Sequence, residues 1–523
     1  MADLFGTYSK RIKLTIDHTK VDATLTWFPV TVFFTDAQAE EIFSELTGDI
    51  KFRKCAFTKA DGVTELYAEK EWFLVYGADV LTGGTATADS DAGAGYEADK
   101  AVDGNISSRW NSTETSFPHW WKYDLGVAVT KTVRKLRLNK YWDAGGSQLK
   151  DFTLQGSNND SDWTVIYTGV TVDEEENEIW EEFTFLNSTA YRYYKINITT
   201  SHREDDWCSI NEIEMLEEAG DPKAIYHVSK DGWEISSSAD TDFYFYYDND
   251  AADNTSYIGA RESTPGYEVW DDDFKLVWHM HDYSTSGVHD STDNANHGLK
   301  QGAGEPSEAD GKVGKGQLFD GDSDYISKAS FLNAASLTVE CVVSLTADDS
   351  WLANKRDAAG NDQWQLRQYN STLGVVLWDG TNIIANVSDG DDIVDAGYKH
   401  VGFTTTGVTD GPLTLYLNGV SNGTPATLTG NMQITSQPLY VGTRAWSTFD
   451  GDMAGIMDEV RISNAARSAA WMKATYNSLW DTLLTYGNEE SAPAGWTGKI
   501  CGVTNPSKIC GIDVADIAKV CGV

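Results

Sequence analysis

The residues best suited to chemistry are oxygen-bearing side chains around a glycine bend at Asp103-Gly104-Asn105, followed by Ser107 and Ser108. A hard cation such as Ca²⁺ takes its ligands from carboxylates, amides and backbone carbonyls, all of which this segment offers. An Asp-Gly turn without metal has the same composition. We expect a calcium site here, with a role in stability rather than catalysis, and the plain turn is the alternative.

Two further segments combine aromatic and polar side chains. Tyr141-Trp142-Asp143 precedes Gly145-Gly146, and His202-Arg-Glu-Asp-Asp-Trp207 is rich in charge. An aromatic ring can pack on the apolar face of a pyranose while polar groups bind its hydroxyls. The candidate glycan-binding residues are Tyr141, Trp142, His202, Arg203, Asp206 and Trp207. The alternative is that both indoles belong to the core, the commoner fate of tryptophan.

Several established catalytic motifs are absent. The chain lacks a Glu-x-Asp-x-x-Glu glycosidase run, His-Glu-x-x-His and a P-loop, and its Gly-x-Ser-x-Gly match at Gly419–Gly423 falls on a segment with an Asn-Gly turn signal. His279 and His281 share one face of an expected strand. They allow a metal site, but two packed imidazoles are the simpler interpretation. We therefore expect a protein that is not an enzyme.

Composition narrows the class of protein. The 40 basic and 80 acidic residues give a formal charge of −40, which disfavours nucleic acid and anionic lipid as partners. No segment is long and apolar enough for membrane insertion. The 46 Gly, 19 Trp and 24 Tyr favour short strands joined by many turns. We expect an all-β fold of several β-sandwich domains.

The elements that must position these residues fall into several regions. The residue pattern of 1–81 recurs at 221–262. This predicts one β-rich domain interrupted by an inserted domain at 82–220. A polar linker at 263–274 and a third domain at 275–488 follow. Residues 489–523 form a repetitive tail, in which a five-residue Lys-apolar-Cys-Gly-apolar pattern occurs three times.

Period-2 alternation and turn signals predict individual elements. Strands are expected at Ile12–Ile16 and Val30–Phe34, and a hairpin with an Asn-Gly turn at Leu413–Val420. Asp36 and Ser468 are expected to cap helices that run to Leu46 and Trp480.

The inserted region resembles the discoidin, or coagulation-factor C-type, domain and the family 32 carbohydrate-binding modules. The motifs that carry this resemblance are Ala101-Val-Asp-Gly-Asn-Ile-Ser-Ser-Arg-Trp110, His119-Trp-Trp-Lys-Tyr-Asp-Leu-Gly126, Phe152-Thr-Leu-Gln-Gly-Ser-Asn158 and Ile210-Asn-Glu-Ile-Glu-Met215. The resemblance implies an eight-stranded jelly roll with its ligand site on the loops at one end. It places Trp110, Trp120 and Trp121 in the core.

The same resemblance implies the ligands of the calcium ion. They are the side chains of Asp103, Ser108 and Glu212 and carbonyls near Lys100 and Asn105.

Residues 275–488 resemble laminin-G-like, concanavalin-A-like jelly rolls. The motifs are Val277-Trp-His-Met280, Asp290-Ser-Thr-Asp-Asn-Ala-Asn-His-Gly298, Gly316-Gln-Leu-Phe-Asp-Gly-Asp-Ser-Asp-Tyr-Ile326 and Gly455-Ile-Met-Asp-Glu-Val-Arg-Ile-Ser463. The resemblance implies a second calcium at Asp290, Asn296 and Asp458, with an Asx turn and a surface carboxylate as the alternative. Candidate sugar platforms, most of them expected in the core, are Trp351, Trp364, Trp378 and Trp446.

The first region resembles a β-rich domain of unknown function found before laminin-G-like domains in bacterial surface and phage proteins. Lys10-Arg-Ile-Lys-Leu-Thr-Ile-Asp17 and Phe245-Tyr-Tyr-Asp-Asn-Asp250 carry this resemblance. The tail resembles C-terminal elements of phage structural proteins, although Cys501, Cys510 and Cys521 stand where asparagine is commoner. These cysteines could form interchain disulfides, buried interface thiols or part of a docking peptide, and reduced interface thiols are preferred.

Together these features predict a glycan-binding adhesin or fibre on a phage virion that attaches to host surface polysaccharide. Expected partners are cell-surface glycans, other virion structural proteins and further copies of the chain. The N-terminus has no leader-like apolar stretch, so we expect release on a virion or an earlier removal of a leader. The alternatives are a structural or decoration protein, an accessory protein of a secreted carbohydrate-active enzyme, and an extracellular or bacterial-surface location.

Overall fold

The structure is a computed structural model of the 523-residue chain. The residues that it describes are 4–35, 42–43, 46, 49–73, 76–113, 116–141, 148–172, 180–185, 187, 189–202, 207–218, 224–284, 286–302, 306–356, 362–435, 437–444, 451–491, 499–500, 503–504, 508–509 and 512–513. Predictions for Asp36, Trp142, Arg203, Asp206 and Trp446 lie outside these residues, as do those for the tail cysteines.

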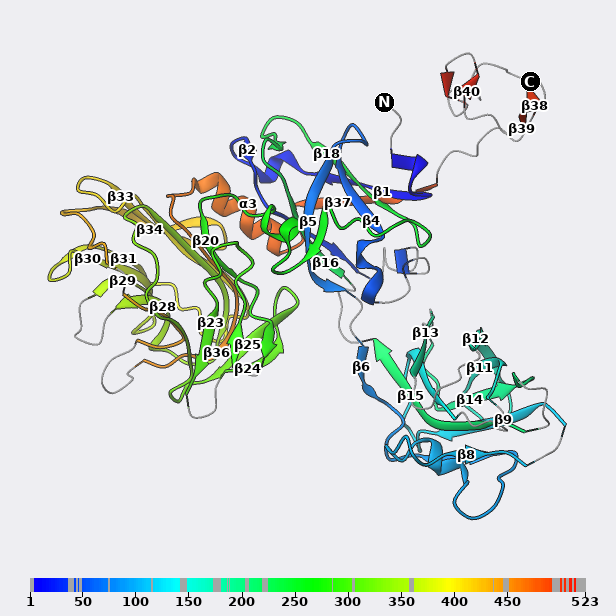
Figure 1. Ribbon diagram of the computed structural model, residues 1–523. Coiled ribbons are helices and arrows are strands. Elements are labelled where there is room, and N and C mark those ends of the chain that lie inside the picture. Colours follow the sequence, from blue (N-terminus) through cyan, green and yellow to red (C-terminus); the bar gives the residue numbers. More distant parts are fainter. Residues whose placement is uncertain are drawn as a thin grey trace. The chain divides into compact units, whose positions relative to one another are not determined.

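The chain divides into two compact units, each described by itself. The first unit consists of residues 1–33, 52–71 and 225–523, and the second of residues 34–51 and 72–224. Both are built of β-strands, which confirms the predicted all-β class (Figure 1). No described helix is long and apolar enough to cross a membrane.

An eight-stranded sheet, here called the N-terminal sheet, opens the first unit with the order β3-β16-β5-β4-β18-β1-β37 and β19 beside β5. Its strands are β1 Lys10–Ile16, β3 Val30–Phe34, β4 Cys55–Lys59, β5 Glu65–Phe73, β16 Ala224–Ser229, β18 Thr241–Tyr247, β19 Ile258–Ala260 and β37 Leu484–Ser491. β1 alternates between buried and half-buried residues, as predicted, whereas all of β3 is buried. The full burial of β3 is typical of a strand covered on both faces.

The rest of the first unit is a sandwich of two sheets. The eight-stranded sheet contains β20 Phe274–Trp278, β24 Ser307–Asp310, β25 Lys315–Asp320, β27 Leu337–Leu345, β32 Lys399–Thr405, β33 Pro412–Leu417, β34 Val420–Thr427 and β36 Ala454–Ser463. The nine-stranded sheet contains β21 Asp282–Ser284, β22 Gly287–Val288, β23 Gly298–Gln301, β26 Tyr325–Lys328, β28 Ser350–Arg356, β29 Asp362–Gln368, β30 Leu373–Trp378, β31 Ile383–Asp389 and β35 Leu439–Val441. Apolar side chains from both sheets, including Trp278, Trp364 and Phe403, form one core.

Two local predictions in the sandwich are confirmed. β33 and β34 form the expected hairpin, and Asn418 and Gly419 both have positive φ, which the Asn-Gly turn accommodates. Helix α3, Ala469–Leu479, begins after Ser468, whose hydroxyl accepts a hydrogen bond from the backbone of Trp471.

The segments before and after the sandwich differ from the expected polar linker at 263–274 and from the expected end of the third domain at 488. Residues 263–274 contain helix α2, Thr264–Tyr267, and the buried Trp270. β37 pairs with β1 of the N-terminal sheet and not with the sandwich. Hydrophobic burial of Trp270 and the β1–β37 ladder therefore join the N-terminal sheet and the sandwich within one unit.

The second unit is a sandwich of two five-stranded sheets. The strands of one are β6 Tyr76–Asp79, β8 Trp110–Asn111, β10 Val133–Lys140, β13 Trp180–Thr184 and β15 Ser209–Glu218. The strands of the other are β7 Thr85–Ala88, β9 His119–Asp124, β11 Asp151–Ser157, β12 Thr164–Val170 and β14 Tyr193–Ile198. Trp110 and Trp121 are fully buried in its core, as predicted. The prediction for Trp120 was wrong, because successive residues of β9 point to opposite faces and Trp120 is only half-buried.

The remaining elements are short. They are the 3₁₀ turns η1 Leu4–Gly6, η2 His18–Lys20, η3 Asp49–Arg53 and η4 Ala98–Ala101, the pair β2 Leu25–Thr26 and β17 Glu234–Ile235, and the tail strands β38 Lys499–Ile500, β39 Val503–Thr504, β40 Lys508–Ile509 and β41 Ile512–Asp513. β38 pairs with β39, and β40 with β41, so the first two tail repeats each lie in a small hairpin. Cys55, Cys208 and Cys341 are buried free thiols, the usual environment of an unpaired cysteine.

Candidate functional site

Several strand ends of the second unit meet at one place. Ile210 at the start of β15 pairs with Lys140 at the end of β10 and with Trp110 at the start of β8. Bridges between Gln148 and Ser209 and between Leu149 and Ser201 join the flanking segments. Residues just beyond these pairings therefore gather at one end of the sandwich, here called the tip. Tyr141, His202 and Trp207 are such residues, and the side chain of Arg109 contacts the Tyr141 ring.

Tyr141 is held by an arginine at the tip. The guanidinium carbon of Arg109 lies 3.7 Å from the centroid of the half-buried Tyr141 ring and 4.9 Å from that of Tyr96. The Arg109 Nε donates a hydrogen bond of 3.1 Å to the side-chain oxygen of Asn111. Because cation–π contacts of this kind orient both partners, one face of the Tyr141 ring is covered and its plane is fixed.

His202 and Trp207 are also half-buried. The Nε2 of His202 lies 2.9 Å from the hydroxyl of Thr171, and its backbone N–H donates to the carbonyl of Gln148. Trp207 precedes Cys208, whose backbone N–H donates to the hydroxyl of Ser112 at 3.0 Å. The structure therefore brings three predicted sugar-binding residues, Tyr141, His202 and Trp207, to the tip. It leaves all three partly open to solvent.

The predicted calcium ligands of the second unit also converge. The hydroxyl of Ser108 donates to both carboxylate oxygens of Asp103, at 2.8 and 2.9 Å, and lies 2.8 Å from the carbonyl of Asn105. Glu212 of β15 accepts a hydrogen bond from the backbone of Gly104 at 3.3 Å. The side-chain Nζ of Lys100 lies 3.6 Å from Oδ2 of Asp103 and neutralises part of the charge of that carboxylate.

Glu212 has an unusual environment for a carboxylate. It is 5% exposed, and its Oε2 is buried with no hydrogen-bond partner. Burial, with Asp103 adding to it, raises the pKa of Glu212 to about 7. A buried carboxylate oxygen without a donor is a group that a cation would satisfy, so this donor set fits calcium.

At the second predicted calcium site, the Asp290 carboxylate already accepts hydrogen bonds from the protein. Both oxygens of the fully buried Asp290 accept hydrogen bonds from its own surroundings, including the backbone N–H groups of Val277, Thr292 and Asn296. Asp458 is fully buried, so the alternative of a surface carboxylate was wrong. Its Oδ2 accepts from the backbone of Val313, and its Oδ1 has no hydrogen-bond partner. Asp290 thus organises a loop in the manner of the Asx-turn alternative. The side-chain amide of Asn296 donates to the carbonyl of Lys275.

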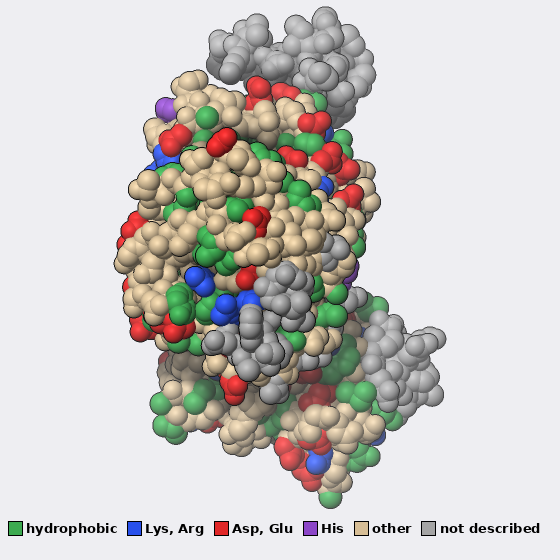
Figure 2. All heavy atoms as spheres, turned by 90° about the vertical axis from the view of Figure 1, so that its left-hand side faces the viewer, with side chains coloured by type: hydrophobic (Ala, Val, Ile, Leu, Met, Phe, Trp, Pro, Cys, Tyr) green, Lys and Arg blue, Asp and Glu red, His purple; other side chains and the backbone are tan. Residues whose placement is uncertain are grey.

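The aromatic side chains proposed as platforms in the first unit are mostly in the core. Trp351 and Trp364 are buried, and Trp378 is half-buried. Trp351 has the guanidinium groups of Arg367 and Arg444 at 5.3 and 5.2 Å from its ring centroid. Figure 2 shows acidic side chains spread over the drawn face rather than gathered in one patch, as the charge of −40 leads one to expect.

The first unit also has an open cavity of about 520 Å³. Its wall includes Trp27 and Trp471, with Asp231 and Asp272 among the polar residues. Arg467 on the same wall is paired with Asp271.

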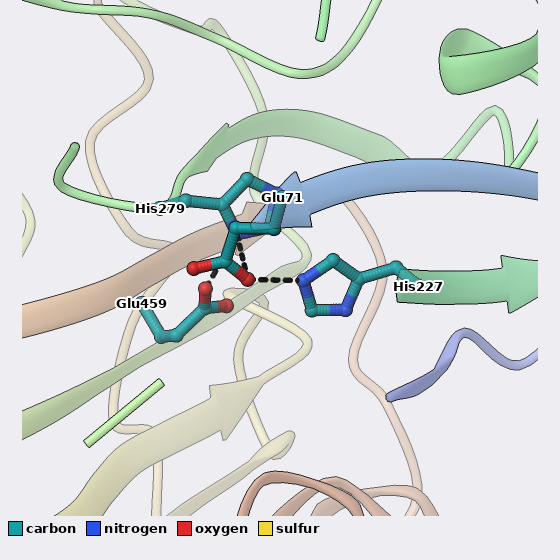
Figure 3. Close-up of side chains that lie close together, drawn as sticks. All are labelled: Glu71, His227, His279 and Glu459. Carbon is teal, nitrogen blue, oxygen red and sulfur yellow. Dashed lines mark hydrogen bonds and ion pairs between the residues drawn. The ribbon is translucent and has the colours of Figure 1, made fainter. Parts of the chain in front are cut away.

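A polar cluster that the sequence analysis did not identify lies inside the first unit (Figure 3). Glu71 of β5 and His227 of β16 come from the N-terminal sheet, whereas His279 follows β20 of the sandwich and Glu459 lies on β36. One ligand atom from each residue lies within 4.8 Å of the others, and all four residues are buried. We call these four residues the buried cluster.

Two of the charged groups are paired, one of them by a residue outside the buried cluster. His279 contacts Glu459, which also accepts a hydrogen bond of 2.8 Å from the Nε of Arg461. Burial raises the pKa of Glu71 well above its ordinary value, and burial likewise lowers the pKa of His227. Burial opposes the charged form of His279, but Glu459 and Glu71 together raise its pKa well above the ordinary value.

Only two of the four residues in the buried cluster lie in motifs that the sequence analysis identified. His279 and Glu459 lie in motifs that indicated the sandwich, and His279 was considered with His281 as a strand-face pair. Instead His279 stacks on His227, with ring centroids 4.5 Å apart and planes within 10°. Glu71 and His227 are separated by the whole insertion, so spacing along the chain gave no signal for them.

Comparisons with known proteins agree with these architectures. Residues 85–213 match the family described as F5/8 type C domain, and residues 320–473 match the concanavalin A-like lectin/glucanases superfamily. No curated protein matches the chain. Residues 85–213 therefore form an F5/8 type C domain, and residues 320–473 lie in a concanavalin A-like domain.

Several of the similar solved structures cover a part of the chain that corresponds to one module. Chitosan-binding module 1 of a chitosanase/glucanase from Paenibacillus sp. IK-5 is 29% identical, and the match covers 27% of this chain and 98% of the module, with a TM-score of 0.23. Module 2 of that protein, solved with chitotriose, is 26% identical over 27% of this chain and 100% of the module, with a TM-score of 0.23. The family 32 module of Clostridium perfringens NanJ, solved with galactose, is 21% identical over 27% and 100%, with a TM-score of 0.24.

Proposed function

We propose that this protein binds glycans through the tip of its F5/8 type C domain. The observation that carries the proposal is the convergence of the half-buried Tyr141, His202 and Trp207 at one end of that sandwich. A half-buried aromatic ring keeps part of its surface available while its base is fixed by packing. This arrangement suits a ring of sugar carbons better than a flexible polar loop does.

The fixed geometry of the tip supports this function. Arg109 holds the plane of Tyr141, and Thr171 lies within hydrogen-bond distance of the imidazole of His202. Side chains that are already ordered lose less conformational entropy when a ligand binds. His202 can exchange its Thr171 contact for a sugar hydroxyl without moving its backbone, which is anchored to Gln148.

Calcium binding by Asp103, Asn105, Ser108 and Glu212 forms part of the proposal. Glu212 belongs to β15, the strand whose start lies at the tip, and the Asp103 loop contacts Glu212 through Gly104. A bound cation would supply charge neutralisation for the two carboxylates. We assign it a role in stabilising the loop and none in chemistry.

At the level of the whole protein, we propose a virion-associated adhesin that attaches to host surface polysaccharide. Two tail repeats lie in short hairpins that are too small to bury a core of their own, which favours attachment to another chain or to other copies of this one. Several copies on one particle would strengthen weak binding at each site.

Two alternatives remain open to the same test. In one, the protein is a structural or decoration component, and in the other it is an accessory protein of a secreted carbohydrate-active enzyme. Catalysis by the buried cluster does not form part of the proposal. Its four side chains are no more than 1% exposed, so no polysaccharide could reach them.

A glycan array probed with the purified full chain tests the proposal. We expect binding to at least one bacterial polysaccharide, reduced by Trp207→Ala and retained by the control Trp163→Ala. Trp163 is a half-buried tryptophan just before β12, at the opposite end of this strand from Thr171. Absence of binding to every polysaccharide, with and without added Ca²⁺, would contradict the glycan-binding function. Unchanged host attachment by Trp207→Ala would favour the structural alternative.

A further inference from the structure

The buried cluster presents a problem of charge and solvation. Two glutamates and two histidines are removed from water inside the first unit, although burying ionisable groups is unfavourable unless they are closely paired. The pairing is incomplete. Oε1 of Glu71 is buried without a hydrogen-bond partner, and Nε2 of His279 has only the carboxylate of Glu69 nearby, at 3.7 Å. Groups of this kind in a folded interior require an explanation.

The donor atoms have the arrangement of a metal site. Oε2 of Glu71 lies 2.7 Å from Nε2 of His227 and 3.6 Å from Nδ1 of His279, which in turn contacts Oε1 of Glu459 (Figure 3). Zinc bonds of 2.0–2.2 Å to nitrogen and oxygen place tetrahedral ligand atoms about 3.4 Å apart. The separations of 2.7 and 3.6 Å lie on either side of that value. Because the rings of His227 and His279 are stacked with planes within 10°, one ring would have to rotate before both nitrogens could bind one ion.

The second nitrogen of each histidine is also placed as in metal sites, where it commonly faces an oxygen that fixes the ring. Nδ1 of His227 lies 3.1 Å from the hydroxyl of Thr31. Nε2 of His279 lies 3.7 Å from Oε2 of Glu69. Glu69 is itself fixed by hydrogen bonds of 2.6 Å from Trp270 and Ser291. Arg461 has the corresponding role for Glu459.

We propose that Glu71, His227, His279 and Glu459 form a structural transition-metal site, for which zinc is the best-fitting ion, and that it joins the N-terminal sheet to the sandwich. Two ionised carboxylates balance the charge of a divalent ion, and the two imidazoles bind in their neutral form. All four ligands come from the protein and are closed to solvent, which is the arrangement of structural rather than catalytic zinc sites. Since each layer supplies one glutamate and one histidine, the ion would hold both layers together.

Gly314 leaves room for the carboxylate of Glu71 in its present position. A Cβ at Gly314, whose φ is +60°, would lie 2.7 Å from Oε1 of Glu71. A larger residue at this position would therefore push the carboxylate away from the other three ligands.

Elemental analysis of the full chain, expressed in zinc-supplemented medium and dialysed into metal-free buffer, tests the proposal. We expect about one zinc ion per chain for the wild type, and loss of most of it in Glu71→Gln, since an amide is a poor ligand for zinc. The matched control is Glu340→Gln. Glu340 forms a buried pair with His400 at 3.1 Å, within the sandwich and outside the buried cluster. This variant should retain the ion.

Cobalt provides a second measurement that does not depend on the stability of a variant. Wild-type chain expressed with Co²⁺ should show the visible absorption bands of a tetrahedral cobalt centre, and these should disappear when zinc replaces it. Wild-type chain that contains neither zinc nor cobalt after these treatments would overturn the proposal. The cluster would then be a proton-sharing network, in which Glu71→Gln, a mimic of the protonated acid, leaves the stability unchanged.

Discussion

The tip of the second unit and the buried cluster of the first unit are both groups of polar and aromatic side chains drawn from distant segments, but they differ in access to water. At the tip, Tyr141, His202 and Trp207 remain half-buried, and Arg109 and Thr171 contact the first two. In the buried cluster every member is sealed from solvent and must be neutralised from within. Under the two proposals, histidine thus serves ligand recognition at the tip and internal cross-linking in the buried cluster.

The largest effect that would test this comparison is expected in the buried cluster. Replacing His279 by Ala leaves Glu459 and Glu71 facing one another without the imidazole. Breaking a buried charge pair on one side destabilises a protein by about 3–5 kcal/mol. Urea unfolding monitored by tryptophan fluorescence should show a loss of this size for the first unit.

The matched change at the tip is His202→Ala, which removes a half-buried imidazole and should alter stability by no more than about 0.5 kcal/mol. A similar loss of stability in both variants would mean that access to water does not separate the two groups.

Calcium should stabilise only the second unit. Free calcium at a hundredfold excess over its Kd adds about 2.7 kcal/mol to the stability of the state that binds it. Calorimetry with added Ca²⁺ and with chelator should therefore shift the unfolding transition of this unit, and Glu212→Gln should reduce the shift. Glu214→Gln is the control, since Glu214 lies on the same strand but pairs with Arg137. A shift of equal size in both variants would exclude Glu212 as a ligand.

A moderate effect on binding, without an effect on the fold, is expected from Trp207→Ala. Loss of one stacking platform should weaken affinity for the strongest array polysaccharide about tenfold, which corresponds to about 1.4 kcal/mol. Isothermal titration calorimetry measures this change, and circular dichroism checks the fold. Trp207→Phe, which keeps an aromatic face, should restore part of the affinity. Equal affinity for all three proteins would contradict the role of the ring.

The smallest effect concerns Lys355, which is buried and forms no ion pair among the residues that the structure describes. Burial lowers the pKa of Lys355 to about 8, and its ammonium contacts the backbone carbonyls of Leu332 and Thr435. The unfolded chain keeps this proton up to its ordinary pKa of 10.5, so stability should rise as pH increases from about 8 to about 10.5. We expect a gain of about 1 kcal/mol after allowance for solvent screening.

Urea unfolding at pH 8 and pH 10, compared with the variant Lys355→Met, measures this gain. The variant should lack the rise. An identical pH dependence in both proteins would show that Lys355 does not titrate as its burial requires.

The sequence by itself determined the all-β class and the positions of many strands, because alternation and turn residues act locally. Ile12, Leu14 and Ile16 face one side of β1, and Asn418-Gly419 permits only a tight hairpin turn. The Asp103 loop and Ser108 were also predictable, since they lie within one short segment. The burial of Trp110 and Trp121 followed from motifs that carried a family resemblance.

Only the tertiary structure decided which distant groups meet. The meeting of Glu71 with His279 and the return of β37 to pair with β1 depend on packing between layers, which no spacing along the chain encodes. Trp120 turned outward for the same reason, since the face of a strand that enters the core depends on the sheet opposite. Short-range patterns fix conformation, whereas burial and charge neutralisation are properties of the assembled interior.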